Sequence, residues 1–374
     1  MPKKRHSIFC LSLLSASLLS VAAIAAQPIV RTNGNVYVLS NQASGNQVLV
    51  FHRNYVGHLT FVDSVAAGGN GGGTGPDPLE SQNPVVLNND GSLLFAVNAG
   101  SNSISAFRVS GNQLIAANTV SSGGTMPVSL TVRGNLLYAL NAKGTPNISG
   151  FTIDKNTGNL SPLAGSTQAL PGGAAAAPAQ VAFVPGEDVL VVTEKDTNQI
   201  DTFGLDPNGV AMTGMAFPSR KPTPFGFAFA GPDHVALISD AAGGKPMKAA
   251  LSAYKIGSGG TLKAVDRGEA NMQTASCWVV VTNDGAYAYT VNTGSGTISS
   301  YSVSVGGDPS LLNPTAGGGN VPVDAAFSQK SQYLYVRNGG DGTISQFHVF
   351  SDGGLRLIDL TKGLPSGAAG LAAN

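Results

Sequence analysis

A short pattern recurs along the chain and constrains its fold more than any other feature. An apolar strand ends in Asn, a small polar turn follows and a second strand begins, as in FAVNAGSNSISAF (95–107). YTVNTGSGTISSY (289–301) and YVRNGGDGTISQF (335–347) are near copies, and YALNAKGTPNISGF (138–151) is a looser one. Repetition on this scale indicates an architecture of stacked or ringed units.

A larger unit surrounds this pattern and contains four short strands joined by tight turns. The complete units begin at Pro84, Pro127, Pro178, Pro224, Trp278 and Pro322. Their spacing of about 40 to 55 residues is the length of one four-stranded propeller blade. The units therefore predict an all-β protein rather than a helical one.

The two ends of the repeat region complement each other. Before the first complete unit, VYVLSN, QVLVFHR and LTFVDSV supply a second, third and fourth strand without a first. At the other end, residues 365–373 resemble a first strand with nothing after it. We therefore predict one seven-bladed β-propeller of four-stranded antiparallel blades, in which the C-terminal strand closes the first blade. An open stack of similar sheets is the alternative, and it leaves the unmatched ends unexplained.

The N-terminus has the features of a secretory leader. Lys3, Lys4 and Arg5 precede an apolar run over residues 8–24, which ends near the small residues that a signal peptidase accepts. We predict a signal peptide over 1–26, a single propeller domain over 27–374 and a periplasmic or secreted protein. A membrane anchor is the alternative, but the run is short and contains several serines. No membrane span is expected after cleavage.

Composition limits the partners and cofactors of the domain. Charged residues make up 11% of the chain and their charges cancel, whereas a nucleic-acid partner would require clustered Lys and Arg. The histidines after the leader show no metal-ligand spacing, and no phosphate-binding loop motif occurs, so we predict neither a metal nor a cofactor. Cys277 is the one cysteine after the leader and is expected to be a small buried side chain. We expect a monomer.

Departures from the repeat mark a candidate site. In a propeller the turns between second and third strands lie around the central channel, on the face where ligands usually bind. We interpret the repeated Asn as a residue that tolerates the backbone angles of such a turn. This position holds Asn98, Asn141, Glu194, Asp240, Asn292 and Asn338. Two units thus carry an acid, and Lys195 and Arg337 flank the same position.

Other segments of this face supply further candidates. Gln180 and Asp324 stand just inside their first strands, and Arg220 lies in a blade junction. Trp278 would either stack on a sugar ring at the floor of the funnel or pack between blades. Asp324 has the alternative role of accepting backbone N–H groups. The glycine-rich loop 68–83 is long enough to act as a lid.

Scarce charges that gather at one mouth suit the hydrolysis of an ester or lactone. We predict Glu194, Arg337 and Arg220 as catalytic residues: the carboxylate would orient or deprotonate water, and the guanidinium groups would hold a substrate acid and stabilise the oxyanion. The predicted substrate-binding residues are Lys195, Asp240, Asp324, Gln180 and Trp278. In the alternative interpretation Glu194 and Lys195 pair with neighbours on a solvated rim, and Asp240 is a turn residue.

Long segments also resemble a known family. CWVVVTNDGAYAYTVNTGSGTISSY (277–301), PVDAAFSQKSQYLYVRNGGDGTISQF (322–347) and the closing GLAAN resemble the lactonase-like propellers, which include bacterial six-phosphogluconolactonases and fungal carboxymuconate-cyclising enzymes. The resemblance implies a seven-bladed fold and sugar-lactone or muconolactone chemistry. In the lactonase branch the fourth repeat opens with Pro-His and later carries an acid. Here Ala179 stands in place of that His while Glu194 retains the acid, so phosphogluconolactonase activity is not implied.

The same segments also resemble the YVTN-type repeats of surface-exposed propellers, which favours a binding or scaffold role. Two hypotheses therefore stand. The first is an exported enzyme that hydrolyses or isomerises a small-molecule lactone or sugar acid. The second is a non-catalytic propeller that binds a ligand or an exported protein partner on its loop face.

Overall fold

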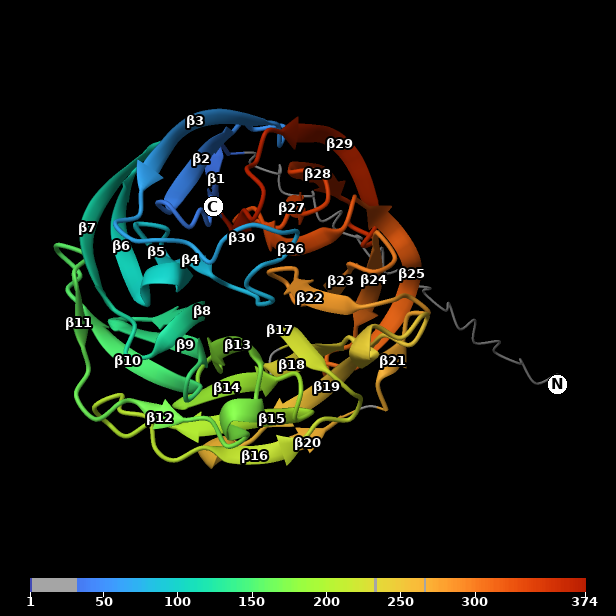
Figure 1. Cartoon of the computed structure of the whole chain (residues 1–374). Coiled ribbons are helices and arrows are strands. Elements are labelled where there is room, and N and C mark those ends of the chain that lie inside the picture. Colours follow the sequence, from blue (N-terminus) through green and yellow to red (C-terminus); the bar gives the residue numbers. More distant parts are fainter. Residues whose placement is uncertain (2–31, 232–233, 266) are drawn as a thin grey trace. The chain divides into compact units, whose positions relative to one another are not determined.

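The computed structural model describes residues 1, 32–231, 234–265 and 267–374. Contacts within the chain define one unit over Met1–Arg31 and another over Thr32–Asn374. Apart from Met1, the predicted signal peptide lies outside the described residues. The described part of the second unit forms seven antiparallel sheets with four strand positions each, and Figure 1 shows these sheets following one another around a central axis. The prediction of an all-β, seven-bladed propeller is confirmed.

Each blade begins with a strand at the channel and ends with a strand at the outside. The first strands of blades one to seven are β30 (Ala369–Ala373), β4 (Val85–Leu87), β8 (Thr125–Arg133), β13 (Pro178–Phe183), β17 (Pro224–Ala230), β22 (Ser276–Val281) and β26 (Pro322–Phe327). The second strands, in the same order, are β1 (Gly34–Leu39), β5 (Leu93–Asn98), β9 (Leu136–Lys143), β14 (Val189–Glu194), β18 (Val235–Asp240), β23 (Tyr287–Asn292) and β27 (Tyr333–Asn338).

The outer half of each blade is built in the same way. The third strands are β2 (Gln47–Arg53), β6 (Ser103–Ser110), β10 (Asn147–Ile153), β15 (Gln199–Gly204), β19 (Ala250–Ile256), β24 (Thr297–Val303) and β28 (Thr343–Val349). The fourth are β3 (Leu59–Ala66), β7 (Gln113–Ser121), β11 (Leu160–Pro162) with β12 (Gln168–Ala169), β16 (Met215–Pro218), β20 (Leu262–Ala264) with β21 (Glu269–Ala270), β25 (Pro309–Gly318) and β29 (Leu355–Lys362). Short 3-10 turns lie at η1 (Ala99–Ser101), η2 (Gly173–Ala175), η3 (Ala242–Gly244) and η4 (Ser258–Gly260).

Blade one joins the two ends of the domain, as predicted. The C-terminal strand β30 pairs antiparallel with β1, with Tyr37 opposite Ala372 and Leu39 opposite Ala369. Arg53, which is 2% exposed, donates Nη2 to the carbonyl oxygen of Asn374 at 2.9 Å and Nη1 to that of Thr32 at 2.6 Å. One guanidinium therefore holds the chain at both ends of the described domain.

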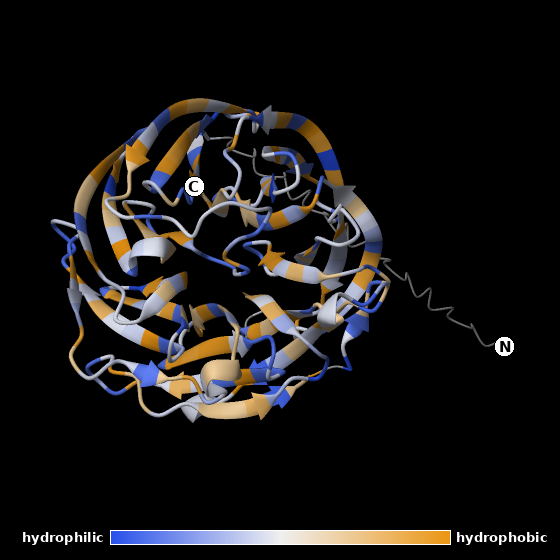
Figure 2. Ribbon diagram, in the orientation of Figure 1, coloured by the Kyte–Doolittle hydropathy of each residue, from blue (hydrophilic) through white to orange (hydrophobic). Residues whose placement is uncertain are grey.

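The strands are apolar because each sheet is covered on both faces by its neighbours. Every residue of β5 is buried, whereas most residues of the outer strand β3 are exposed or half-buried. Figure 2 shows the same change, with apolar residues prominent along the inner strands and a mixed pattern along the outermost ones. Burial of these side chains between blades supplies the core, since most of the apolar surface is removed from water there.

The repeated Asn has a different role from the one predicted. Asn98 is fully buried, with φ −119°, and its Nδ2 donates to Ser105 Oγ on the next strand at 2.8 Å. Asn292 bonds Ser299 at 2.9 Å in the same way. The turn residue with a left-handed backbone is instead Asn102, with φ 53°. The repeated Asn therefore joins the second strand to the third inside the blade, where a buried amide requires partners.

Candidate active site under the loop between blades one and two

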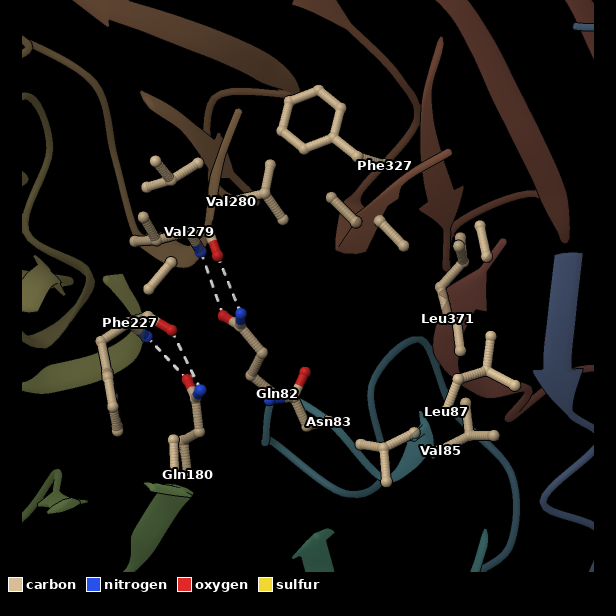
Figure 3. Close-up of a pocket in the computed structure, with 18 of the residues that line it drawn as sticks. Gln82, Asn83, Val85, Leu87, Gln180, Phe227, Val279, Val280, Phe327 and Leu371 are labelled. Atoms are coloured by element: carbon tan, nitrogen blue, oxygen red, sulfur yellow. Dashed lines mark hydrogen bonds between the residues drawn. The ribbon is translucent and has the colours of Figure 1, made fainter. Parts of the chain in front are cut away.

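The loop between β3 and β4 crosses the channel mouth and is fixed at both ends. Near β3, Gly72 N donates to Asn41 Oδ1 at 2.6 Å. Near β4, the side-chain amide of Gln82 exchanges two hydrogen bonds with the backbone of Val279 in blade six, at 2.8 and 3.0 Å, as Figure 3 shows. Gln82 N also donates to Ala179 O in blade four at 3.1 Å. The loop thus braces blades on opposite sides of the channel.

Two cations of the propeller wall hold the middle of this loop. Arg337 Nη2 donates to Pro76 O at 2.9 Å. Lys195 Nζ donates to Glu80 O at 2.7 Å and lies 3.3 Å from a carboxylate oxygen of Glu80. Asp77 Oδ1 accepts the N–H of Glu80 at 3.2 Å. A carboxylate of the loop, Asp77, is therefore placed among the charges of the wall.

A bulge in the first strand of blade seven brings Asp324 next to Arg337. Pro322 pairs with Asn338 and Ala325 pairs with Val336, so Val323 and Asp324 together lie opposite Arg337. Asp324 has φ 67°, a left-handed backbone that is uncommon for any residue but Gly. Such bulges redirect a side chain at the edge of a binding site.

Burial and mutual attraction set the protonation of this group. Burial raises the pKa of Asp324 to about 7, opposed by the N–H of Ala325 and by the charge of Arg337. Burial likewise raises the pKa of Asp77 to about 6, opposed by Arg337 and Lys195. Burial lowers the pKa of Arg337, and the two carboxyl groups oppose that change. Two carboxyl groups that titrate near neutral pH beside fixed cations form a candidate acid–base site.

The charged group has hydrogen-bonding capacity left over. Arg337 is 2% exposed and Asp324 is 3% exposed. Among the described residues, Arg337 Nε and Asp324 Oδ2 are buried and form no hydrogen bond within 3.5 Å, although the backbone N–H of Leu371 lies close enough to the Asp324 carboxylate to lower its pKa. Most buried polar atoms in proteins are paired, so one unpaired donor and one unpaired acceptor indicate a place where a ligand or water binds.

The channel beneath the loop is neutral. A cavity of about 490 Å³ is lined mainly by aliphatic and aromatic side chains of the first strands, together with Gln82, Asn83 and Gln180 (Figure 3). No charged side chain is among the described residues that line it. Gln180 exchanges two hydrogen bonds with the backbone of Phe227, at 2.6 and 3.0 Å, and so joins blades four and five. The charged group of Asp77, Asp324, Arg337 and Lys195 therefore lies outside the lining of this cavity.

A family model described as "Lactonase, 7-bladed beta-propeller" matches residues 46–176 and 245–368, which is more than half of the chain. This chain belongs to that lactonase family. The sequence resemblance to lactonase-like propellers is thereby confirmed. The comparison with curated proteins gives no match.

Solved structures of similar fold include two with related descriptions. A protein of Bacteroides fragilis, described as a proposed 6-phosphogluconolactonase, superposes with a TM-score of 0.71 and 19% identity over 91% of this chain and 98% of that one. The periplasmic gluconolactonase PpgL of Pseudomonas aeruginosa superposes with a TM-score of 0.70 and 15% identity over 91% and 99% of the two chains. At these identities the likeness concerns the fold.

The structure of this lactonase-family chain brings some of the predicted site residues together. Lys195, Asp324 and Arg337 share the charged group under the loop. Asp324 also shows the alternative role, because its Oδ1 accepts Ala325 N at 2.8 Å while Oδ2 stays unpaired. Arg220 lies elsewhere on the surface, exposed between β16 and β17, and its N–H donates to the Tyr254 hydroxyl.

The two acids in the Asn position are used inside their own blades. Glu194 is fully buried and accepts hydrogen bonds from Gly172 N at 3.0 Å and from the Thr197 hydroxyl. Burial, followed by a hydrogen bond and repulsion from Glu194, raises the pKa of neighbouring Asp201 to about 9. Asp240 accepts from Ser252 Oγ at 2.5 Å, which reverses the direction of the bond that Asn98 donates to Ser105 in blade two. Glu194 and Asp201 thus take the positions that Asn98 and Ser105 hold in blade two, and the proximity of Glu194 adds to the rise in the pKa of Asp201.

Trp278 supports the loop from below. It is 1% exposed, packs against Phe225 with ring centroids 5.0 Å apart, and donates Nε1 to Ser81 O at 2.9 Å. Of its two predicted roles, the structure shows packing between blades. Blade six begins at Ser276 rather than at Trp278, so Trp278 occupies the position that Gln180 has in blade four.

Other residues near the site complete its chemistry. Cys277 is a free, buried thiol whose pKa burial raises to about 12, which leaves it a poor nucleophile. Ala179, at the family's His position, is buried, and its carbonyl oxygen holds Gln82. Across the described ranges, no three His, Cys, Asp or Glu side chains are placed to share a metal ion.

Sequence reasoning missed Asp77 and Glu80. These are the two acids of the segment 68–83, which was assigned only the role of a lid. In a chain with 11% charged residues, two acids in an otherwise neutral loop were a usable signal. None of the helices in the described part of the chain has the length and apolar character needed to span a bilayer.

Proposed function

We propose that this lactonase-family propeller hydrolyses a lactone or a related sugar-acid ester at the charged group formed by Asp324, Arg337 and Lys195. The observation that carries the proposal is that the same charged group contains a buried acceptor, Asp324 Oδ2, and a buried donor, Arg337 Nε, and that neither atom forms a hydrogen bond within 3.5 Å among the described residues. Lactone hydrolysis requires both, a base for water and a donor for the oxyanion.

The chemistry follows from the charges. With its pKa raised to about 7, Asp324 is partly ionised at neutral pH and can accept a proton from an attacking water. The water oxygen adds to the ring carbonyl, and the developing oxyanion accepts a hydrogen bond from Arg337. The acyl C–O bond of the ring then breaks, and Asp324 returns the proton to the departing alkoxide. Lys195 adds positive charge on the side of the site formed by blade four.

Location and assembly are part of the same proposal. The basic and apolar leader supports export, so the substrate would be met in the periplasm or outside the cell. We propose that the domain acts as a monomer on a small molecule, because its candidate site is built within one chain.

A panel of sugar lactones tests the proposal. Mature protein is compared with Asp324→Asn and with Glu194→Gln. Because Asn cannot take a proton, kcat/KM should fall by about 10²- to 10⁴-fold in Asp324→Asn. The wild-type kcat/KM should rise with pH through about 7, as Asp324 loses its proton.

The same panel separates the two candidate bases. A much larger loss in Glu194→Gln than in Asp324→Asn would return the base to Glu194, the residue predicted from sequence. Equal rates in wild type and Asp324→Asn would overturn the role of Asp324.

A non-catalytic binding module is the second candidate. The observation that favours it is that Arg337 and Lys195 both bond the backbone of the loop, which covers the mouth. Binding of a ligand without turnover of any lactone would support this function.

A further inference from the structure

One part of the loop is built differently from the rest. We call residues 73–78 the lid segment. Gly72 and Gly73, at its start, are bonded to Asn41, and the residues after it are fixed by Leu79, which is buried, and by Gln82. The lid segment itself runs between two glycines with positive φ, Gly73 (111°) and Gly75 (126°), and then over Arg337.

The two glycines can serve as hinges. A Cβ added to Gly73 or Gly75 would meet no atom within 4 Å, so their surroundings are open. Their φ values belong to a region that side-chain-bearing residues rarely adopt, and glycine can leave it freely. Rotation about Gly75 and about the C-terminal bond of Gly73 would release Pro76 and Asp77, while the hydrogen bond from Gly73 N to Asn41 O and the anchor at Gln82 stay in place.

The lid segment offers Arg337 the groups that an acidic sugar would offer. Its Pro76 carbonyl accepts one N–H of Arg337, and the Asp77 carboxylate lies in the field of Arg337 and Lys195. A carbonyl oxygen near a carboxylate is also the set of hydrogen-bond acceptors that a sugar acid or its lactone presents. The lid segment therefore resembles a bound acid that is part of the protein.

The fit of the lid segment is incomplete. It satisfies Nη2 of Arg337 but leaves Nε without a partner among the described residues. A free carboxylate can accept from Nε and Nη2 together in a paired geometry, which makes such hydrogen bonds stronger and more directional. A ligand that carries a carboxylate would therefore supply the hydrogen-bond acceptor that Nε of Arg337 lacks when the lid segment is bound.

We propose that the lid segment blocks the Arg337 site in the resting protein, and that a ligand carrying a carboxylate displaces it by binding Nε and Nη2 of Arg337 as a pair. This proposal rests on the proposed function only for the identity of the site, and it names the ligand as a sugar acid, the product class of lactone hydrolysis, whose carboxylate takes the place that the oxyanion has during the reaction. Binding, rather than turnover, decides it.

Calorimetric titration with D-glucuronate tests the proposal, with the neutral D-glucuronamide as the matched ligand. Wild type should bind glucuronate at least about tenfold more tightly than glucuronamide, because only the acid pairs with Arg337. Asp77→Asn should bind glucuronate about five- to tenfold more tightly than wild type, because the competing carboxylate is gone. Arg337→Lys, which keeps the charge but loses the pair, should bind it about tenfold more weakly.

Asp63→Asn is the control for loss of one carboxylate, because Asp63 is exposed on the outer strand β3, and its affinity should equal that of wild type. Hydrogen exchange reports the movement directly: glucuronate should speed exchange of the Glu80 amide, which donates to Asp77 Oδ1 at 3.2 Å, and leave that of the Gln82 amide, which donates to Ala179 O, unchanged. The proposal is overturned by equal binding of the two ligands, by an unchanged affinity in Asp77→Asn, by no binding of glucuronate, or by slower exchange of the Glu80 amide. Tight binding to Asp77→Asn would support it even if no lactone were hydrolysed.

Discussion

Replacing Arg53 by Met should weaken the closure of the ring in blade one. The guanidinium is buried and makes three hydrogen bonds to two backbone carbonyls, one at Thr32 and two at Asn374. Met has a similar stem and fills the same apolar space. The substitution therefore removes the donors while leaving most of the packing.

The size of the effect follows from these bonds. A hydrogen bond from a charged group contributes about 1.5–3 kcal/mol, and the two backbone oxygens left behind, which are half-buried or exposed, would regain part of this from water. Removing a buried charge returns part of its desolvation cost, which here lowers the pKa of Arg53. We expect a net loss of about 3 kcal/mol in the free energy of unfolding.

Urea unfolding followed by the fluorescence of Trp278, the one Trp in the chain, measures this loss. Arg108→Met is the matched control, because Arg108 is exposed on β6 and should change stability by less than about 0.5 kcal/mol. If Arg53→Met unfolded within about 1 kcal/mol of wild type with the same dependence on urea, the inference that Arg53 secures the closure would be wrong.

Two further predictions concern the loop face. Burial and Glu194 raise the pKa of Asp201 to about 9. Between about pH 4 and pH 9 the folded chain therefore keeps a proton on Asp201 that the unfolded chain has released. The free energy of unfolding is highest below about pH 4 and falls as the pH rises toward 9. The double variant Glu194→Asn with Asp201→Ser should therefore gain melting temperature over wild type at pH 8 but not at pH 4; equal gains at both would contradict the assignment. Gly339→Ala should displace the lid segment, because the new Cβ would lie 2.2 Å from Pro76 O. Faster hydrogen exchange over residues 73–78 with little change in melting temperature is expected, and unchanged exchange would show that the loop tolerates the contact.

The fold could be predicted from the sequence because the repeats show which strands are equivalent in successive blades. Four blades place Asn at the same position near the end of the second strand, and the unpaired strands at the two ends of the chain could be matched to each other. The closure of β1 on β30 followed directly. The repeats do not show whether a side chain at the end of a strand points into the blade or into the turn. The repeated Asn was therefore predicted to be a turn residue, whereas Asn98 is buried and donates to Ser105.

The site was only partly predictable for a related reason. Lys195, Asp324 and Arg337 stand out because each departs from the repeat, and the structure gathers these three. Asp77 and Glu80 lie in a loop that has no counterpart in other blades. Its position depends on contacts such as Gln82 with Val279, which are 197 residues apart in sequence, and a local pattern contains no information on them.

The reach of Gln82 has a consequence for the evolution of this ring. The backbone N–H of Gln82 donates to blade four and its side-chain amide bonds blade six. This one residue therefore fixes the distance between these two blades at the channel. Propellers change size by gaining or losing a blade, which widens or narrows that opening. In this protein an added blade would move Val279 out of reach of the Gln82 amide. The hydrogen bonds of this one side chain are therefore compatible only with the present number of blades.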